Sequence, residues 1–364
     1  MVNKRHNIFL GLLPLLLVIE LLASIVCFPR AIRGNADFHQ FYNGAYMLRA
    51  GYRHQLYDYD LQVKVGGSQL PSVHPAYEYL LFVPLSFLRY RTAYFAWLLV
   101  NCGLIIAAIR LLRSYFTGSG WLLAGIVIAF IPVWVTLYEG QDSLLLLVLL
   151  LLAARSDEFG SGLWLGLGAF KFHIVVPIML LYLLWRKWRV VAGFGVSGGL
   201  VAVISIALVG IGGTLHYVHA ASGMALTYLH PGAMPNVHGL LLRIAGAKFG
   251  SNHIITLLTV AIAAVTFAWA SRQKPSLATA ILVLPLTTVY LLGHDLALLL
   301  IPIVASELWL TWAGSVLILA SGPYAGFAVL PLLADLLVNT LVPDATRRPR
   351  RHSPSSFVAA QKSR

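Results

Sequence analysis

The sequence contains little charge for its length. Charged residues make up 11% of the 364 residues, and aspartate and glutamate together number only 13. Soluble domains contain roughly a quarter charged residues, and the mean hydropathy here is +0.80, so water is not the main solvent of this chain. Its apolar runs are continuous rather than alternating, and a segment in lipid must satisfy its own backbone hydrogen bonds. The sequence therefore predicts an all-α, polytopic integral membrane protein.

Cysteine is also scarce, and basic charge is confined to short segments. Cys27 and Cys102 both lie in apolar runs, where a small buried hydrophobe is a better interpretation than half of a disulfide. The net charge is +13, but the basic residues cluster in flanks such as Lys4-Arg5, Arg186 to Arg189 and Arg347 to Arg351. This is the positive-inside pattern of membrane proteins rather than a nucleic-acid-binding face. We therefore expect both termini in the cytoplasm, and no nucleic-acid partner.

The first apolar run is long enough to be a span. A helix needs about 20 apolar residues to cross the hydrocarbon core, and the run from Ile8 to Phe28 has this length. It is too long for the apolar part of a signal peptide, and it lacks a small-residue cleavage site. We expect an uncleaved first span, followed by a first outer loop at about residues 29–76.

The remaining runs predict one transmembrane domain over residues 1–342. It would contain about twelve spans, or ten if the short runs Tyr77 to Leu88 and Ser143 to Ala154 do not cross. The parity set by the basic flanks places a second outer loop at about residues 214–253. Residues 343–364 are rich in Arg, Ser and Pro, and are expected to form a basic, disordered cytoplasmic tail.

The first outer loop contains most of the acidic candidates. Apolar residues at three- and four-residue spacing between Asp37 and Arg49 predict an amphipathic helix that could lie in the headgroup plane. Asp37 heads this helix, so its carboxylate is either an N-terminal cap or a catalytic group. Asp58-Tyr-Asp60 resembles a metal-binding Asp-x-Asp pattern, but the same residues suit the start of a helix. We expect no metal ion in the site.

Other polar residues interrupt apolar runs. Lys171 lies inside a long apolar run, where an ammonium group is costly unless it reaches an interface, a cavity or an anion. His294 and Asp295 lie between two apolar runs, and this position makes them functional candidates. The segments Glu139-Gly-Gln-Asp142 and Asn236-Val-His238-Gly are first interpreted as loops and turns.

In chain order, these segments resemble a known group of membrane enzymes. The matching motifs are Asp37-Phe-His-Gln-Phe-Tyr42, Leu56-Tyr57-Asp58, His74-Pro75, Gly140-Gln141, the membrane lysine Lys171, Pro235-Asn236-Val-His238-Gly239 and Leu292-Gly-His294-Asp295. The ordered set resembles the GT-C superfamily of membrane glycosyltransferases, most closely glycosyltransferase family 87. Two positions depart from the family pattern, because His74 lies where the family usually has a Tyr-x-Pro-Pro segment and His238 stands in place of a serine.

The resemblance implies an inverting transferase that works at the outer face of the inner (plasma) membrane. It would move a hexose, mannose in characterised relatives, from a polyprenyl-phosphate donor to a lipid or cell-envelope glycan acceptor, without a cofactor. The implied catalytic residues are Asp37, as general base, and His294. Contacts to the donor and its phosphate are implied for Lys171, Arg243, Asp295 and Gln141. Substrate contacts are implied for Tyr42, His74, Asn236 and His238.

A different function class remains open at the level of sequence. A transporter or flippase of lipid-linked glycans would use the same basic membrane residues without a general base. Many transporters carry internal repeats, with their sites near the bilayer midplane. This sequence has no evident repeat and has a long outer loop, which favours the enzyme.

Overall fold

The computed structural model describes residues 2–66, 72–227, 234–246, 252–319 and 325–341. Within these ranges every regular element is a helix, and no strand is present. The predicted basic tail, residues 343–364, lies outside the described residues. The all-α fold class is confirmed.

Five helical segments are long and apolar enough to cross a membrane. They are Gly11–Ile32 in α1 (Val2–Ile32), Tyr90–Tyr115 in α5 (Tyr90–Leu112) and η3 (Arg113–Tyr115), Glu158–Leu184 in α9 (Glu158–Leu167), η4 (Gly168–Lys171) and α10 (Phe172–Leu184), Trp188–Ser222 in α11 (Trp188–Thr227), and α13 (His253–Ser271). A sixth would be α6 (Gly120–Ile128) with α7 (Ile131–Glu139), which are bent by 57°. The chain is a polytopic membrane protein, and a total of ten to twelve spans stays a prediction.

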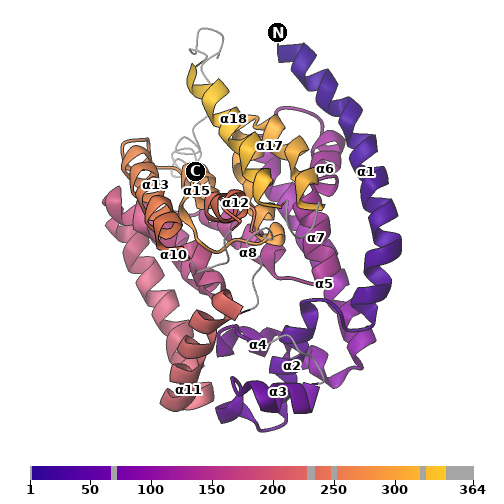
Figure 1. Cartoon of the computed structure of the whole chain (residues 1–364), viewed down its shortest axis with the longest axis vertical. Coiled ribbons are helices and arrows are strands. Elements are labelled where there is room, and N and C mark those ends of the chain that lie inside the picture. Colours follow the sequence, from indigo (N-terminus) through magenta and orange to yellow (C-terminus); the bar gives the residue numbers. More distant parts are fainter. Residues whose placement is uncertain (1, 67–71, 228–233, 247–251, 320–324, 342–364) are drawn as a thin grey trace, which may run out of the picture.

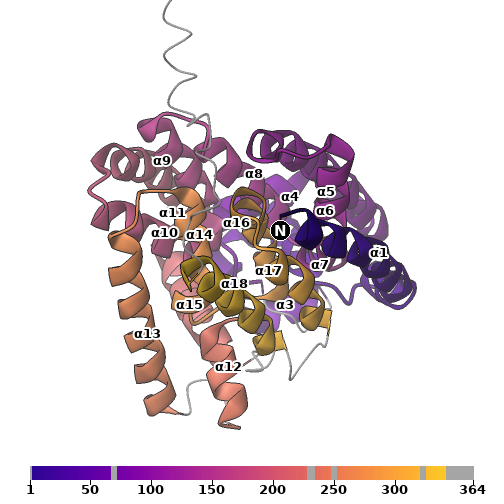
Figure 2. The ribbon, with the colours of Figure 1, turned by 90° about the horizontal axis from the view of Figure 1, so that it is seen from above.

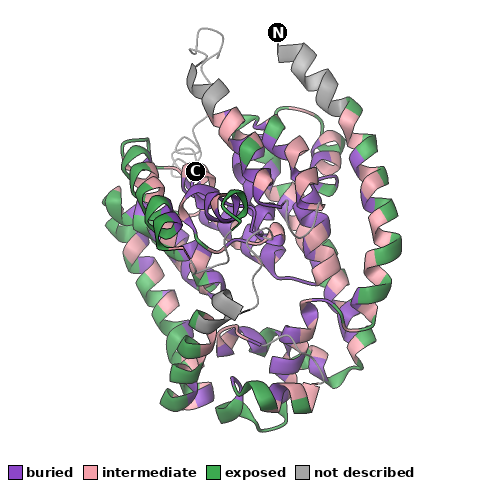
Figure 3. Ribbon diagram, viewed as in Figure 1, coloured by how far each residue is buried: buried purple, intermediate pink, exposed green. Residues whose placement is uncertain are grey.

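Several of these helices expose apolar side chains on the outside of the bundle. Leu21 and Ile25 of α1 are 66% and 67% exposed, and Ile254 and Leu257 of α13 are 77% and 68% exposed. Figure 3 shows such exposed positions along α1, α11 and α13, around a buried interior. Soluble proteins rarely expose large contiguous apolar surfaces. Lipid contact accounts for these faces.

Not every predicted span is a continuous helix. From residue 277 onwards the described elements are short: α14 (Leu277–Leu282), α15 (Leu284–Thr287), η6 (Gly293–Leu299), α16 (Leu300–Ser306), α17 (Trp309–Gly314), η7 (Ser315–Leu319), η8 (Ala325–Ala328) and α18 (Val329–Leu341). Likewise α8 (Ser143–Ala153) has 11 residues, about 16 Å of helix against a hydrocarbon core of about 30 Å. Of these, α8, η6 and α16 consist mainly of buried residues, and Figure 2 shows α14 to α18 between α13 and α1.

The predicted first outer loop and the short run Tyr77 to Leu88 that follows it are folded together into a small helical layer. It contains α2 (Phe38–Arg49), η1 (Arg53–Gln55), α3 (Tyr59–Gly66), α4 (Ala76–Phe82) and η2 (Val83–Phe87). Figure 1 shows α2, α3 and α4 together at the end of the molecule where α1 finishes, opposite the N-terminus. The predicted amphipathic helix is present as α2. It packs against α4, η2 and α5, so protein covers much of the surface that could have faced headgroups.

Glycines allow α9 and α11 to pack closely. A Cβ at Gly162 would lie 2.0 Å from the Val190 carbonyl oxygen, and one at Gly193 would lie 2.1 Å from the Phe159 carbonyl oxygen. Small residues let membrane helices approach in this way. The close packing of α9 against α11 fixes the position of η4, which follows α9 directly and ends at Lys171.

The segment predicted as the second outer loop differs from the expected course. α11 continues to Thr227, with a kink at Gly210, where φ is 75°. The predicted loop therefore begins as helix. His54 of the first outer loop has its Nδ1 3.0 Å from the carbonyl oxygen of Val209, so the kink is also a contact between α11 and that loop.

Candidate active site

Asp37 heads α2 as expected, but its carboxylate does not cap the helix. The residue occupies the N-cap position and makes no side-chain capping hydrogen bond. Instead Gln141 Nε2 donates to Asp37 Oδ2 at 2.8 Å, and Gln40 Nε2 lies 3.4 Å from Oδ1. Asp37 is half-buried. Its carboxylate is therefore held between α2 and the end of α7 while keeping some exposed surface.

The turn after α7 brings two polar side chains to Asp37. α7 ends at Glu139, and Gly140 has a φ of 64°, in the left-handed region that favours glycine. A Cβ at Gly140 would also lie 2.6 Å from Phe38 Cβ, so glycine permits the close approach of α2. In this conformation Glu139 Oε2 accepts the backbone N–H of Asp37 at 3.2 Å, and Gln141 reaches the carboxylate.

Lys171 lies in a buried cluster of opposite charge. Its Nζ is 2.8 Å from Asp295 Oδ1 and 3.0 Å from Asp142 Oδ1, and none of the three side chains is more than 4% exposed. The turn η4 interrupts an apolar span at Lys171, and α8 begins directly after Asp142. The ammonium group is thus compensated by two carboxylates, and an anion is one of the surroundings that the sequence allowed for it.

Asp295 is the centre of this cluster. Ser143 Oγ donates to Asp295 Oδ1 at 3.2 Å, and the N–H of Leu292 donates to Oδ2 at 3.1 Å. The Nε2 atoms of His173 and His294 each lie 3.5 Å from an oxygen of the same carboxylate. The structure therefore places His294 and the membrane lysine around one acidic group, although they are far apart in sequence.

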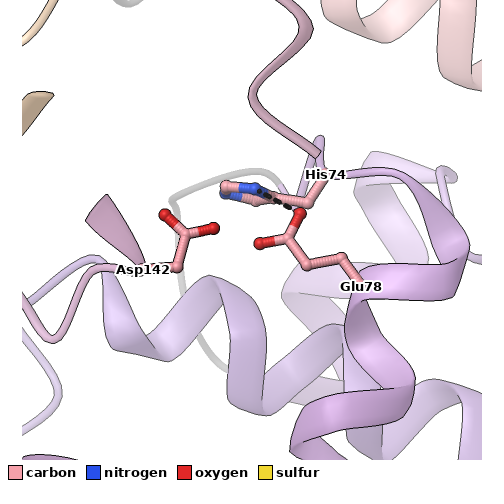
Figure 4. Close-up of side chains that lie close together, drawn as sticks. All are labelled: His74, Glu78 and Asp142. Carbon is pink, nitrogen blue, oxygen red and sulfur yellow. Dashed lines mark hydrogen bonds and ion pairs between the residues drawn. The ribbon is translucent and has the colours of Figure 1, made fainter. Parts of the chain in front are cut away.

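His74 and Glu78 lie beside this cluster. Its Nδ1 lies 3.1 Å from Glu78 Oε2, and its ring packs on Phe41 at a centroid distance of 4.4 Å. Burial lowers the pKa of His74 to about 4, and the nearby Lys171 acts in the same direction, whereas Asp142 opposes it. The imidazole is therefore neutral near pH 7. Figure 4 shows His74, Glu78 and Asp142 turned toward one another.

The two parts of the site are adjacent in the chain. Gln141 contacts Asp37, and the next residue, Asp142, contacts Lys171. One short segment between α7 and α8 therefore joins a half-buried carboxylate to a buried charged cluster. A carboxylate can accept a proton in group transfer, and fixed positive or hydrogen-bonding groups can stabilise the charge that develops.

Four residues implied by the resemblance have contacts in other places. Tyr42 donates through its hydroxyl to Leu88 O at 2.7 Å. Asn236 accepts from Gly239 N at 2.7 Å, as the cap of α12 (Val237–Ile244), and His238 Nδ1 lies 2.9 Å from Thr259 Oγ1. Arg243 is exposed on α12. α12 packs against α13, α15 and η8, and none of these elements contains Asp37 or Lys171. Substrate contact by these four residues stays a prediction.

The Asp-x-Asp pattern marks the start of a helix. Asp58 Oδ1 accepts the backbone N–H of Leu61 at 3.0 Å, and Asp60 lies in the first turn of α3. Both aspartates are exposed. A carboxylate at a helix N-terminus is a favoured structural arrangement, and it agrees with the interpretation preferred from the sequence.

Several members of the cluster were not singled out by sequence. Glu78 and Asp142 were acidic residues without an assigned role, and Ser143 and His173 had none either. The available signal was Asp142 at the beginning of a run too short to cross the bilayer, since such backbone is tolerated where protein buries it. Nothing local in the sequence shows that Glu78 lies beside Asp142.

Comparison with known families decides the class of the protein. The model of glycosyltransferase family 87 matches residues 73–302, well over half of the chain. The chain belongs to glycosyltransferase family 87. The family 87 chain is therefore a membrane glycosyltransferase, and the transporter alternative is set aside. The matched range includes Gln141, Lys171 and Asp295 but not Asp37. No curated protein and no solved structure matches the chain.

Proposed function

We propose that this family 87 member is an inverting hexosyltransferase. It moves mannose from a polyprenyl-phosphate donor to a hydroxyl of a lipid or cell-envelope glycan acceptor, at the outer face of the plasma membrane. The observation that carries the proposal is the half-buried carboxylate of Asp37. It does not cap α2, and Gln141 holds it beside a buried charged cluster.

The chemistry follows from these positions. The acceptor oxygen forms a bond to the anomeric carbon, while the bond from that carbon to the phosphate oxygen breaks and polyprenyl phosphate leaves with the electron pair. Asp37 takes the proton of the acceptor hydroxyl as the new bond forms. One base acting without a covalent nucleophile gives inversion at the anomeric carbon.

Gln141 is suited to orient a substrate beside Asp37. Its Nε2 donates to Asp37, whereas its Oε1 is buried and has no hydrogen-bond partner among the described residues. A buried amide oxygen without a partner is costly, and a sugar or acceptor hydroxyl would satisfy it. In our proposal, Lys171 supplies positive charge and His294 a hydrogen-bond donor near the leaving phosphate, and Asp295 holds both in place.

An outward-facing site explains the lipid-linked donor. The first outer loop lies at the opposite end from the N-terminus, and the basic flank before α11 predicts cytoplasm at the N-terminal end. We expect a cysteine placed at exposed Asn35 to react with a membrane-impermeant thiol reagent in intact cells, with Cys27 and Cys102 replaced by alanine. A cysteine at exposed Arg189 should react only after permeabilisation. The reverse pattern would contradict the outward site.

The donor is tested with purified protein in liposomes. Mannose labelled with ¹⁴C is supplied either on polyprenyl phosphate or on a nucleotide, together with a lipid extract as acceptor. We expect label to reach an acceptor only from polyprenyl phosphate, and the product to have the inverted anomeric configuration by NMR. Transfer from the nucleotide donor, or a retained configuration, would contradict the proposal.

A further inference from the structure

Three potential metal ligands from two segments converge in the interior. His74 precedes α4, Glu78 lies in the first turn of α4, and Asp142 precedes α8. One ligand atom from each lies within 4.8 Å of the others. In Figure 4 the imidazole and the two carboxylates surround a common point.

The two carboxylates have oxygens without hydrogen-bond partners. Glu78 and Asp142 are each 1% exposed. Within the described part of the chain, Glu78 Oε1 and Asp142 Oδ2 accept no hydrogen bond. Lys171 approaches the other oxygen of Asp142, Oδ1, at 3.0 Å. A buried carboxylate oxygen without a partner is costly, so these atoms point to a missing ligand.

The charge of the surroundings has the sign that a cation requires. Glu78, Asp142 and Asp295 are buried carboxylates, and Lys171 is the one lysine or arginine that contacts them in the described structure. The buried carboxyl groups therefore outnumber the single ammonium group. Uncompensated buried charge is expensive, and a divalent cation balances this excess.

We propose that His74, Glu78 and Asp142 bind one divalent cation, Mn²⁺ or Zn²⁺. One imidazole nitrogen with two carboxylates suits such ions better than Mg²⁺, which prefers oxygen ligands alone. Ligands about 2.0–2.2 Å from an ion lie roughly 3.0–3.5 Å apart, and His74 Nδ1 is 3.1 Å from Glu78 Oε2. Asp142 binds through Oδ2, while Lys171 on Oδ1 fixes its orientation, as hydrogen bonds to metal-binding carboxylates commonly do.

This site departs from the metal-free site expected from the sequence, and it is distinct from Asp58-Tyr-Asp60. Binding of the ion does not depend on the identity of the sugar. Its use does rest on the proposed function: Asp142 contacts Lys171, so the cation would add positive charge beside Lys171, where the proposal places the leaving phosphate.

The test measures metal content and affinity rather than activity. Full-length protein in detergent is stripped with EDTA, loaded with Mn²⁺ or Zn²⁺, desalted and analysed by elemental mass spectrometry; Mn²⁺ affinity is measured by electron paramagnetic resonance. We expect about one equivalent per chain, and an affinity at least about 100-fold lower in Glu78→Gln and Asp142→Asn. The control Asp60→Asn alters an exposed acidic residue and should bind as wild type does.

A spectroscopic measurement on folded wild-type protein covers the case in which a variant fails to fold. Electron spin echo of bound Mn²⁺ should show coupling to an imidazole nitrogen, and this signal should be absent in His74→Gln. Absence of bound metal at 1 mM Mn²⁺ and Zn²⁺, as expected if Glu78 and Asp142 share a proton instead, would overturn the proposal. So would equal binding by Glu78→Gln, or loss of binding in Asp60→Asn.

Discussion

Asp37 and Lys171 are linked through two consecutive residues, Gln141 and Asp142, yet their surroundings differ. Asp37 is half-buried and has amide contacts on one side, and Gln141 beside it keeps an unused acceptor atom. Lys171 is 3% exposed and contacts two carboxylates. A group that acts on substrate needs hydrogen-bonding atoms that the protein itself does not occupy. A buried charge that is already compensated mainly maintains the geometry and the electrostatic potential of the site. The comparison assigns proton transfer to Asp37 and a supporting electrostatic role to Lys171.

The largest expected loss of stability follows from breaking the buried cluster. Lys171→Met leaves Asp142 and Asp295 as buried charges without their ammonium partner, and this should lower the free energy of unfolding by about 3–5 kcal/mol. Unfolding in detergent, followed by circular dichroism, measures the change. The matched control is Lys187→Met, which removes an exposed ion pair to Glu158 and should cost no more than about 1 kcal/mol. Equal stability of the two variants would mean that Lys171 is not paired as described.

A smaller effect is expected from the turn that joins the two regions. Gly140→Ala places a side chain at a φ of 64° and against Phe38, with a strain of about 1–3 kcal/mol. The displaced Gln141 should lower turnover by up to about 100-fold. The control is Gly195→Ala, where a Cβ meets nothing within 4 Å; it should be neutral or slightly stabilising. Normal turnover of Gly140→Ala would show that the turn does not position the site.

The smallest effect concerns the hydrogen bond to Asp37. Gln141→Leu removes a donor at 2.8 Å, and a hydrogen bond to a charged group contributes about 1.5 kcal/mol or more. We expect kcat/KM to fall roughly tenfold, with only a small decrease in Tm. Gln40→Leu removes only the longer 3.4 Å contact and should have less effect. A larger loss in Gln40→Leu would reverse the assigned importance of the two amides.

Sequence predicted the elements that depend on local apolar length. The spans in α1, α5 and α13 follow from runs of about 20 apolar residues, and the helix headed by Asp37 follows from its spacing. After residue 277 the apolar runs form short helices rather than continuous long ones, and sequence does not show this because an apolar run buried by protein resembles one that faces lipid. Only packing distinguishes the two cases.

The candidate site was predictable in part, where a residue stands out from its local sequence. His294, Asp295 and Lys171 were singled out because charge inside apolar runs is rare and costly. Their mutual contact, and the contact of Glu78 with Asp142, depend on segments more than 60 residues apart that meet only in the folded bundle. Asn236 was a turn residue in sequence, and it caps α12 in the structure.

The most direct test of the account is the turnover of Asp37→Asn in the reconstituted assay. Asparagine keeps the shape of the side chain but cannot accept the proton, so transfer from polyprenyl-phosphate mannose should fall by about 10²–10⁴-fold. Tm and donor binding should match those of wild type, and Asp60→Asn should retain full activity. Turnover of Asp37→Asn near the wild-type rate would contradict the assignment of Asp37 as the general base.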